Sequence, residues 1–111
     1  MAATMATRIN PESIEAIADR LRLIRLAYGI AQGYTREMSQ SEIARLAGIG
    51  IQAWHNAEKG HNRIGVDSAI ALAKATGVTL NYIYLGQRDH VPHTLAVEIE
   101  KLENPKAAKR A

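Results

Sequence analysis

The sequence predicts an all-α fold, and composition, periodicity and the placement of glycine lead to that prediction. Hydrophobic residues make up 47% of the 111 residues, yet only 5% are aromatic and phenylalanine is absent, so the core must be aliphatic and rich in alanine. Alanine and leucine carry the smallest penalties in helices. Apolar residues recur at helical spacing between glycines, and no alternating apolar and polar run is long enough for a strand. A chain of this length has room for one domain.

The first predicted helix begins with Asn10 as N-cap and Pro11 at the first helical position, and it ends at Gly29. Apolar residues at helical spacing give it one buried stripe. Leu23 and Leu26 fall outside this stripe; they form either a second packing face inside a bundle or a cover for a longer loop or a partner. The stretch that follows shows no regular pattern and receives no assignment.

Two short helices are expected next. Ser39 and Glu42 have the Ser-x-x-Glu form of a capping box, in which the hydroxyl and the carboxylate each satisfy a free N–H at a helix start. This box predicts a helix over 40–47, which Gly48 stops because glycine readily adopts the left-handed conformation. Another helix is expected over 51–59, closed by the glycine that follows it.

Three further helices complete the prediction. One covers 66–76, and the next begins at the N-cap Thr79 and ends at Gly86. Pro92 opens a last, amphipathic helix that ends before Asn104. We therefore expect five helices in one domain, followed by a C-terminal amphipathic helix.

These elements divide the chain into four expected parts. They are a flexible leader over 1–9, a domain over 10–86, a linker and C-terminal helix over 87–103, and a basic tail over 104–111.

Composition excludes several classes of function. The absence of cysteine removes disulfides, thiolate metal sites and a cysteine nucleophile. The leader lacks the apolar core of a signal peptide and no stretch is long enough to span a membrane, so we expect a cytoplasmic protein without membrane contact. Residues 20–88 carry nine Lys or Arg against four Asp or Glu, and this basic centre points to an anionic partner.

Residues 40–59 have the pattern of a helix-turn-helix, two short helices joined by a tight turn. The two helices cross closely at Ala44, which must be small, and the turn needs a residue such as Gly48 that tolerates a positive φ. Large apolar side chains must fill the wedge between the helices, and the candidates are Ile43, Ile49 and Trp54.

Several short motifs follow one another between residues 20 and 86. They are Arg20-Leu21-Arg22-Leu23-Ile24-Arg25, Ser39-Gln40 with Ala44 and Gly48, Glu58-Lys59-Gly60, Leu72-Ala73-Lys74, Gly77-Val78-Thr79-Leu80 and Tyr84-Leu85-Gly86. Over about 20–86 the chain thereby resembles the phage-repressor-like (Xre and Cro type) helix-turn-helix DNA-binding proteins. The resemblance implies a five-helix repressor-like DNA-binding domain.

The resemblance also implies roles for individual residues. In that family the second helix of the motif reads bases in the major groove. The implied base-reading residues are Ile51, Gln52 and Asn56, with His55 at the edge of reach. Side-chain amides can pair with adenine through two hydrogen bonds, although without the motif these polar residues would read as a solvated helix face. The implied phosphate contacts are Ser39, Gln40, Lys59, His61, Asn62 and Arg63, and an ion pair of Arg25 with Glu58 would hold the recognition helix at its angle.

Three departures from the family pattern limit these assignments. About eight extra residues lie between Gly29 and Met38. Gly50 stands where a Ser or Thr N-cap is usual. Trp54 stands where Ile or Val is usual, and Ala57 stands where Leu or Ile is usual. One side chain is larger and the other smaller, so the core volume stays roughly constant.

The implied function is sequence-specific DNA binding by a transcriptional regulator, a repressor that binds a palindromic operator on double-stranded DNA as a homodimer. The alternative is a helix-turn-helix fold used as a protein-interaction module, antiactivator-like or antitoxin-like. On this interpretation the Gly50 cap and the apolar Ile51 indicate that DNA binding has been lost. An enzyme is not expected, because no Gly-rich phosphate loop or nucleophile arrangement occurs. His90 and His93 lack further ligands nearby, so neither a metal nor another cofactor is expected.

A homodimer needs an apolar surface away from the recognition helix. The expected residues are Tyr82, Leu85, Leu95, Ile99 and Leu102. These side chains form either the dimer surface, which we expect, or a contact with their own bundle, because an isolated short helix needs packing. On the first interpretation, truncation after Gly86 leaves a folded monomer.

Overall fold

The structure is a computed structural model that describes residues 10–104. Six helices occur in this part of the chain: α2 (Ile14–Ala31), α3 (Gln40–Ala47), α4 (Ile51–Glu58), α5 (Val66–Thr76), α6 (Leu80–Leu85) and α7 (His93–Glu103). These residues contain no strand, so the predicted all-α fold is confirmed. The expected leader and residues 105–111 of the expected tail lie outside the described residues.

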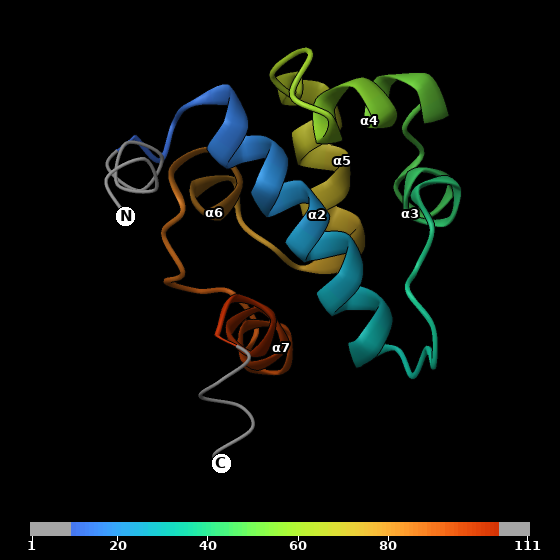
Figure 1. Cartoon of the computed structure of the whole chain (residues 1–111), viewed down its shortest axis with the longest axis vertical. Coiled ribbons are helices and arrows are strands. Elements are labelled where there is room, and N and C mark those ends of the chain that lie inside the picture. Colours follow the sequence, from blue (N-terminus) through green and yellow to red (C-terminus); the bar gives the residue numbers. More distant parts are fainter. Residues whose placement is uncertain (1–9, 105–111) are drawn as a thin grey trace.

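The long helix α2 runs through the middle of the view in Figure 1, with α3, α4 and α5 on one side and α6 and α7 on the other. It contacts α4, α6 and α7, while α3 contacts α4 and α5. Helix α4 therefore packs on α2, whereas α3 packs on α4 and α5. None of the helices within 10–104 has both the length and the hydrophobicity to cross a membrane.

Helices α3, α5 and α6 have the bounds expected from their local signals, and α6 lies between its predicted N-cap Thr79 and Gly86. Helix α3 begins after Ser39 with a complete capping box, and Gly48 ends it at φ 75° in the left-handed region. Helix α5 likewise ends at Gly77, at φ 91°. Short-range hydrogen bonding and glycine conformation are sufficient to set these ends.

One aliphatic core joins all six helices. Its fully buried large side chains come from every helix: Ile17, Leu21, Ile24, Ile43, Trp54, Leu72, Tyr82, Ile83 and Ile99. Leu23 and Leu26 are also buried. Leu23 belongs to the core cluster, as expected for a second packing face of α2, whereas Leu26 lines the cavity bordered by residues 34–37, which fits the alternative of a cover for a longer loop.

The predicted start of the first helix is wrong by one turn. The N-cap is Ser13, whose hydroxyl oxygen accepts a hydrogen bond from the N–H of Ala16. Asn10 and Pro11 form a preceding turn instead, in which the N–H of Ser13 donates to the carbonyl of Asn10 at 3.0 Å. The guanidinium of Arg20 also donates to the carbonyl of Pro11, and this contact directs the turn toward α2.

Gly29 does not end α2, contrary to the prediction. The helix continues to Ala31 with Gln32 as C-cap, and Gly33 adopts the left-handed conformation, at φ 93°. Gly29 is buried, and a Cβ atom placed on it would lie 2.8 Å from the Cβ of Met38. The absence of a side chain thus allows the segment before α3 to pack directly on the helix.

Helix α7 packs along α2 inside the same core, so most of the expected dimer surface is wrong. Leu95 and Ile99 are buried against the bundle, and so is Tyr82 of α6. Leu102 is partly buried and packs against the core, which leaves Leu85, at 45% exposure, as the exposed member of the expected set. The apolar stripe of α7 therefore contacts its own chain.

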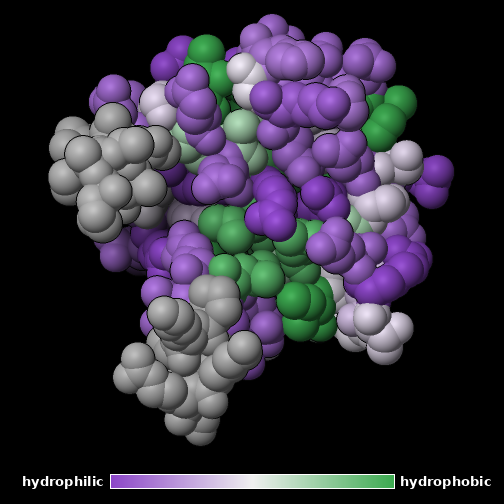
Figure 2. Space-filling view, viewed as in Figure 1, coloured by the Kyte–Doolittle hydropathy of each residue, from purple (hydrophilic) through white to green (hydrophobic). Residues whose placement is uncertain are grey.

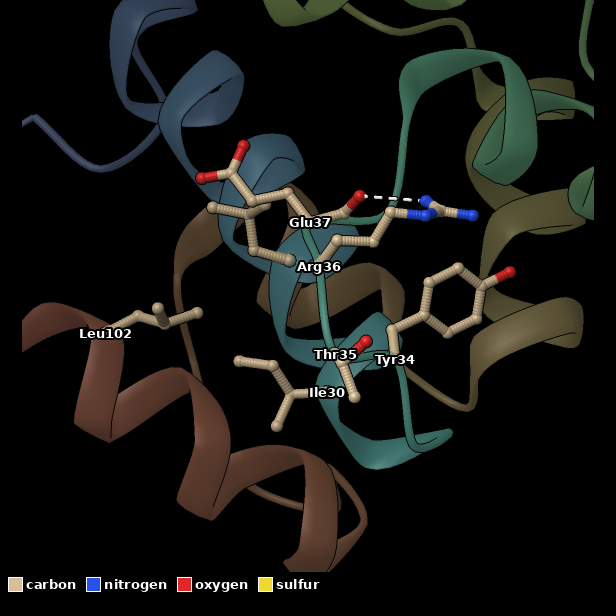
Figure 3. Close-up of a pocket in the computed structure, with 7 residues that line it drawn as sticks. Ile30, Tyr34, Thr35, Arg36, Glu37 and Leu102 are labelled. Atoms are coloured by element: carbon tan, nitrogen blue, oxygen red, sulfur yellow. Dashed lines mark hydrogen bonds between the residues drawn. The ribbon is translucent and has the colours of Figure 1, made fainter.

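Residues 32–38, the stretch between α2 and α3 that received no assignment, border a cavity. Residues 34–37 lie beside the C-terminal part of α2 and, with α7, border a cavity of about 370 Å³. Ile30 and Leu102 face this hollow from α2 and α7 in Figure 3, and Figure 2 shows an apolar patch over the same helices. The extra residues thus border a cavity on α2, outside the helix-turn-helix unit.

Candidate nucleic-acid interface

The N-terminus of α3 carries a charged cluster beside its capping box. The Oγ of Ser39 accepts from the N–H of Glu42 at 3.1 Å, and the Glu42 carboxylate accepts from the N–H of Ser39 at 2.8 Å. Arg36 binds the same carboxylate through two hydrogen bonds of 2.9 and 2.8 Å. The hydrogen bonds from Arg36, then from the backbone and side chain of Ser39, lower the pKa of Glu42 to about 2. The negative charge at this helix start is thus matched by an arginine.

Arg36 was missed by the sequence reasoning and is a further candidate for contact with an anion. Its guanidinium is well exposed and lies 5.0 Å from the ring centre of Tyr34. A cation held on an aromatic face and a carboxylate keeps a defined position. The signal available in the sequence was an arginine three residues before the capping-box serine, within a stretch that had no assigned structure.

The start of α4 presents an exposed face with no side-chain cap. Its N-cap is Gly50, whose lack of a side chain leaves the first N–H groups without a hydroxyl or carboxylate partner from that residue. Ile51 is 49% exposed, and Gln52 is also exposed. The amide nitrogen of Gln52 donates to the Oδ1 of Asn56 at 3.3 Å, one turn further on. These two amides are consequently adjacent on one face of the helix.

Gln40 at the start of α3 is joined to His55 in the last turn of α4. The Nδ1 of His55 lies 2.9 Å from the Oε1 of Gln40. An amide oxygen only accepts, so this bond requires the proton on Nδ1 and leaves Nε2 as an acceptor. Gln40 also helps to lower the pKa of Glu58. The side chain of Gln40 is therefore directed toward α4, and a ligand at the start of α3 would meet chiefly backbone N–H groups.

The loop after α4 carries the remaining expected phosphate contacts. Lys59 is the C-cap of α4, and Gly60 turns the chain at φ 82°. His61, Asn62 and Arg63 are all exposed. Arg63 donates to the carbonyl of Glu12 at 2.9 Å, so one of its nitrogens is already bonded to the segment before α2.

The expected ion pair between the first helix and the end of α4 is present. The Nε and Nη2 of Arg25 donate to the two carboxylate oxygens of Glu58 at 3.0 and 2.5 Å, and both side chains are almost buried, at 11% and 6% exposure. Trp54 donates its indole N–H to Glu58 at 2.7 Å. Burial alone would raise the pKa of Glu58, but the hydrogen bonds and charge of Arg25, together with Trp54 and Gln40, outweigh it and lower the pKa.

The third nitrogen of Arg25 binds the chain at the start of the helix-turn-helix unit. The Nη1 of Arg25 donates to the carbonyl of Met38 at 2.6 Å, one residue before the N-cap of α3. Arg25 thus contacts the chain just before α3 and at the last residue of α4, and it fixes both helices relative to α2.

Trp54 and Ala57, the two motif positions that depart from the family in size, both lie in the core. Trp54 is fully buried and Ala57 nearly so, and both belong to the main core cluster. The indole is the side chain that fills the space between α4 and α2, which leaves the polar residues of α4 to its outer face. The prediction that Trp54 is a core residue is confirmed.

Comparison with known proteins gives one match. Residues 35–83 match a family model described as helix-turn-helix. The match covers α3, α4, α5 and the first part of α6, which is less than half of the chain. No curated protein and no solved structure matches the chain.

Proposed function

We propose that the protein represses transcription by binding a palindromic operator as a homodimer. The match of residues 35–83 to a helix-turn-helix family model supports this proposal. The observation that carries the proposal is the exposed outer face of α4, with Gln52 and Asn56 adjacent on it, next to the capped start of α3. Donors at a helix start suit a phosphate, and side-chain amides suit a base edge.

The proposed contacts divide into two kinds. Gln52 and Asn56 read bases, while Ile51 packs against a thymine methyl and His55 lies at the edge of the contact. The start of α3 at Ser39 and Gln40 and the loop residues Lys59, His61, Asn62 and Arg63 contact phosphates, and we add Arg36 to this set. The Arg25–Glu58 pair acts as a positioning element for α4.

A titration of DNA binding against salt tests the proposal. The full chain is mixed with labelled genomic fragments and the binding constant is measured from low to high salt. Contact with phosphates predicts a linear fall of log K with log salt, with a slope of about −0.9 for each phosphate contacted. Preference for a palindrome over its isolated half-site, with two half-sites about 34 Å apart, is expected for a homodimer.

A second function is favoured by one observation. Ile51, a large apolar side chain, is half exposed at the uncapped start of α4, and such a residue also suits contact with another protein. In that case the domain is a protein-interaction module of the antiactivator or antitoxin kind. Absence of DNA binding even at low salt would favour this function over the first.

A further inference from the structure

The imidazole of His55 lies between the two helices that are proposed to contact DNA. His55 is in the last turn of α4, and its Nδ1 lies 2.9 Å from the Oε1 of Gln40, the first residue of α3. Helices α3 and α4 contact each other and are neighbours in Figure 1. Ile51, one turn before His55 on the same face of α4, is exposed. The ring of His55 is therefore placed where α3 meets the outer face of α4.

A chain of polar contacts decides which end of the Gln40 amide faces His55. The carboxylate of Glu58 accepts hydrogen bonds from Arg25 and Trp54. Gln40 helps to lower the pKa of Glu58, and an amide does so through its N–H groups, because its oxygen would repel the carboxylate. The amide nitrogen of Gln40 is thus directed toward Glu58, and its oxygen is the end that faces His55.

The position of the imidazole proton follows from this contact. The amide oxygen of Gln40 only accepts, so the neutral ring of His55 carries its proton on Nδ1 and leaves a lone pair on Nε2. Within residues 10–104 no hydrogen bond reaches Nε2, and the buried polar atom without a partner in this part of the chain is the hydroxyl oxygen of Tyr82. Nε2 is therefore an acceptor that solvent, or a ligand on this face, can reach.

We propose that His55 reads a base that presents an amino group in the major groove, with Nε2 as the acceptor, and that Gln40 is the positioning residue that fixes the tautomer. This inference rests on the proposed function, because it requires α4 in the major groove. Cytosine and adenine present an amino group there, whereas guanine and thymine present a carbonyl oxygen at the corresponding place. His55 therefore favours cytosine or adenine over guanine or thymine at one position of one strand.

The same polarity excludes a phosphate as the partner of His55. Phosphate oxygens only accept hydrogen bonds, and an imidazole nitrogen without a proton has nothing to donate to them. The contact thus differs from those proposed for Lys59 and Arg63, which are cations. It also differs from those of Gln52 and Asn56, whose amides both donate and accept. His55 therefore adds sequence information and no salt-dependent affinity.

NMR spectroscopy of the full chain without DNA tests the tautomer. At mildly alkaline pH, where free imidazole is neutral, the ring nitrogen signals of His55 should show the proton on Nδ1 in the wild type. Gln40→Met, which keeps a side chain of similar size but removes the acceptor, should lose this signature. The exposed residues His61, His90 and His93 are internal controls, and their signals should stay the same in both proteins. A proton on Nε2 of His55 in the wild type, or an unchanged His55 spectrum in Gln40→Met, overturns the proposal.

Binding to variants of an operator selected from random duplexes tests the base contact. Each base pair of a half-site is replaced in turn by the other three. At one position the wild type should prefer cytosine or adenine to guanine or thymine by about two- to tenfold, the range expected of one hydrogen bond. His55→Asn should lose this preference, because its amide N–H can still donate to Gln40 but the shorter side chain does not reach the place of Nε2. Gln40→Met should reduce the same preference.

The outcomes separate this inference from the proposed function. Loss of base preference at no position in His55→Asn, although the wild type binds the operator, overturns the inference and leaves DNA binding intact. A preference for guanine at the affected position also overturns it, because that contact requires a proton on Nε2. If the wild type binds no DNA even at low salt, the proposed function and the base contact fail together. Chemical denaturation of His55→Asn and Gln40→Met shows that both variants are folded, so that a lost preference is not a lost structure.

Discussion

Arg25 and Glu58, 33 residues apart in the chain, form a nearly buried ion pair with two hydrogen bonds, and this pair joins α2 to the last residue of α4. Removal of one partner leaves the other as a buried charge without compensation, which destabilises far more than loss of a surface pair. We therefore expect the pair to contribute to the stability of the fold and to hold the angle of the helix proposed to enter the major groove.

Glu58→Gln should lower the free energy of unfolding by about 3 kcal/mol, because it leaves the Arg25 guanidinium without its counter-charge. Chemical denaturation at neutral pH measures the change. The matched control is Arg36→Gln, which breaks the exposed pair with Glu42 and should destabilise the protein far less, because solvent screens an exposed pair. Equal losses in the two variants would contradict the assigned difference in burial.

The Glu42 cluster predicts a contribution to stability that disappears in acid. The pKa of Glu42 is lowered from 4.5 to about 2 in the folded protein, so its contribution is fully present above 4.5 and is lost as the pH falls toward 2. The melting temperature of the wild type should exceed that of Glu42→Gln at pH 6, and the gap should close in strong acid. A gap that stays constant with pH would show that the charge of Glu42 contributes nothing.

Substitutions on α4 and in the following loop should affect DNA binding in different ways. Gln52→Ala and Asn56→Ala should each reduce discrimination at particular base pairs by about 1 to 3 kcal/mol. Arg63→Ala should weaken binding to all sequences alike and flatten the salt dependence, since it removes a phosphate contact. Binding to a panel of single-base operator variants separates the two effects, with Gln87→Ala, an exposed change outside the interface, as control. If neither Gln52→Ala nor Asn56→Ala changed DNA binding although both proteins stayed folded, another face of the protein would read the DNA.

Helix α7 should be required for folding. Ile99→Ala should lower the free energy of unfolding by about 2 to 5 kcal/mol, because Ile99 is fully buried, whereas Leu85→Ala should have a small effect. Truncation after Gly86 should likewise destabilise the protein instead of leaving a folded monomer. Denaturation measures the stability of the variants, and sedimentation measures their oligomeric state. If Ile99→Ala kept the stability of the wild type but no longer formed a dimer, α7 would be a dimer interface after all.

Gly29→Ala should destabilise the protein although it replaces glycine in a helix. Such a change normally stabilises a helix interior by about 1 kcal/mol. Here the new Cβ would lie 2.8 Å from the Cβ of Met38, so the segment before α3 must move. Gly50→Ser is the opposite case, because the space around Gly50 is open and a serine N-cap should add a few tenths of a kcal/mol. Denaturation measures both, and a stabilised Gly29→Ala would mean that this packing is loose.

Local signals predicted those elements whose ends are decided locally. The capping box of Ser39 with Glu42 and the left-handed glycines at 48 and 77 set their helix ends without help from the rest of the fold. The start of α2 could not be decided in this way, because Asn10 and Ser13 are both good N-caps and the choice of Ser13 accompanies the contact of Arg20 with Pro11.

Tertiary contacts account for the other differences. Gly29 resembles a helix stop in the sequence, but its approach to Met38 gives another reason for a glycine at this position, namely that a side chain would not fit. An amphipathic stripe such as that of α7 indicates that a helix packs against something, but it does not indicate whether the partner is the same chain or another. For the candidate site, the resemblance supplied the Arg25–Glu58 pair, whereas the Gln40–His55 contact and the position of Arg36 depend on side-chain geometry that no spacing rule contains.

The three contacts of Arg25 also affect how the molecule opens. One guanidinium binds the carbonyl of Met38 before α3 and the carboxylate of Glu58 at the end of α4, so neither end of the unit between them can leave α2 without loss of a bond to the same group. Proteins open locally in contiguous cooperative segments. We therefore expect residues 39–58 to open as one such segment, because release of either end breaks a bond to the guanidinium that also holds the other.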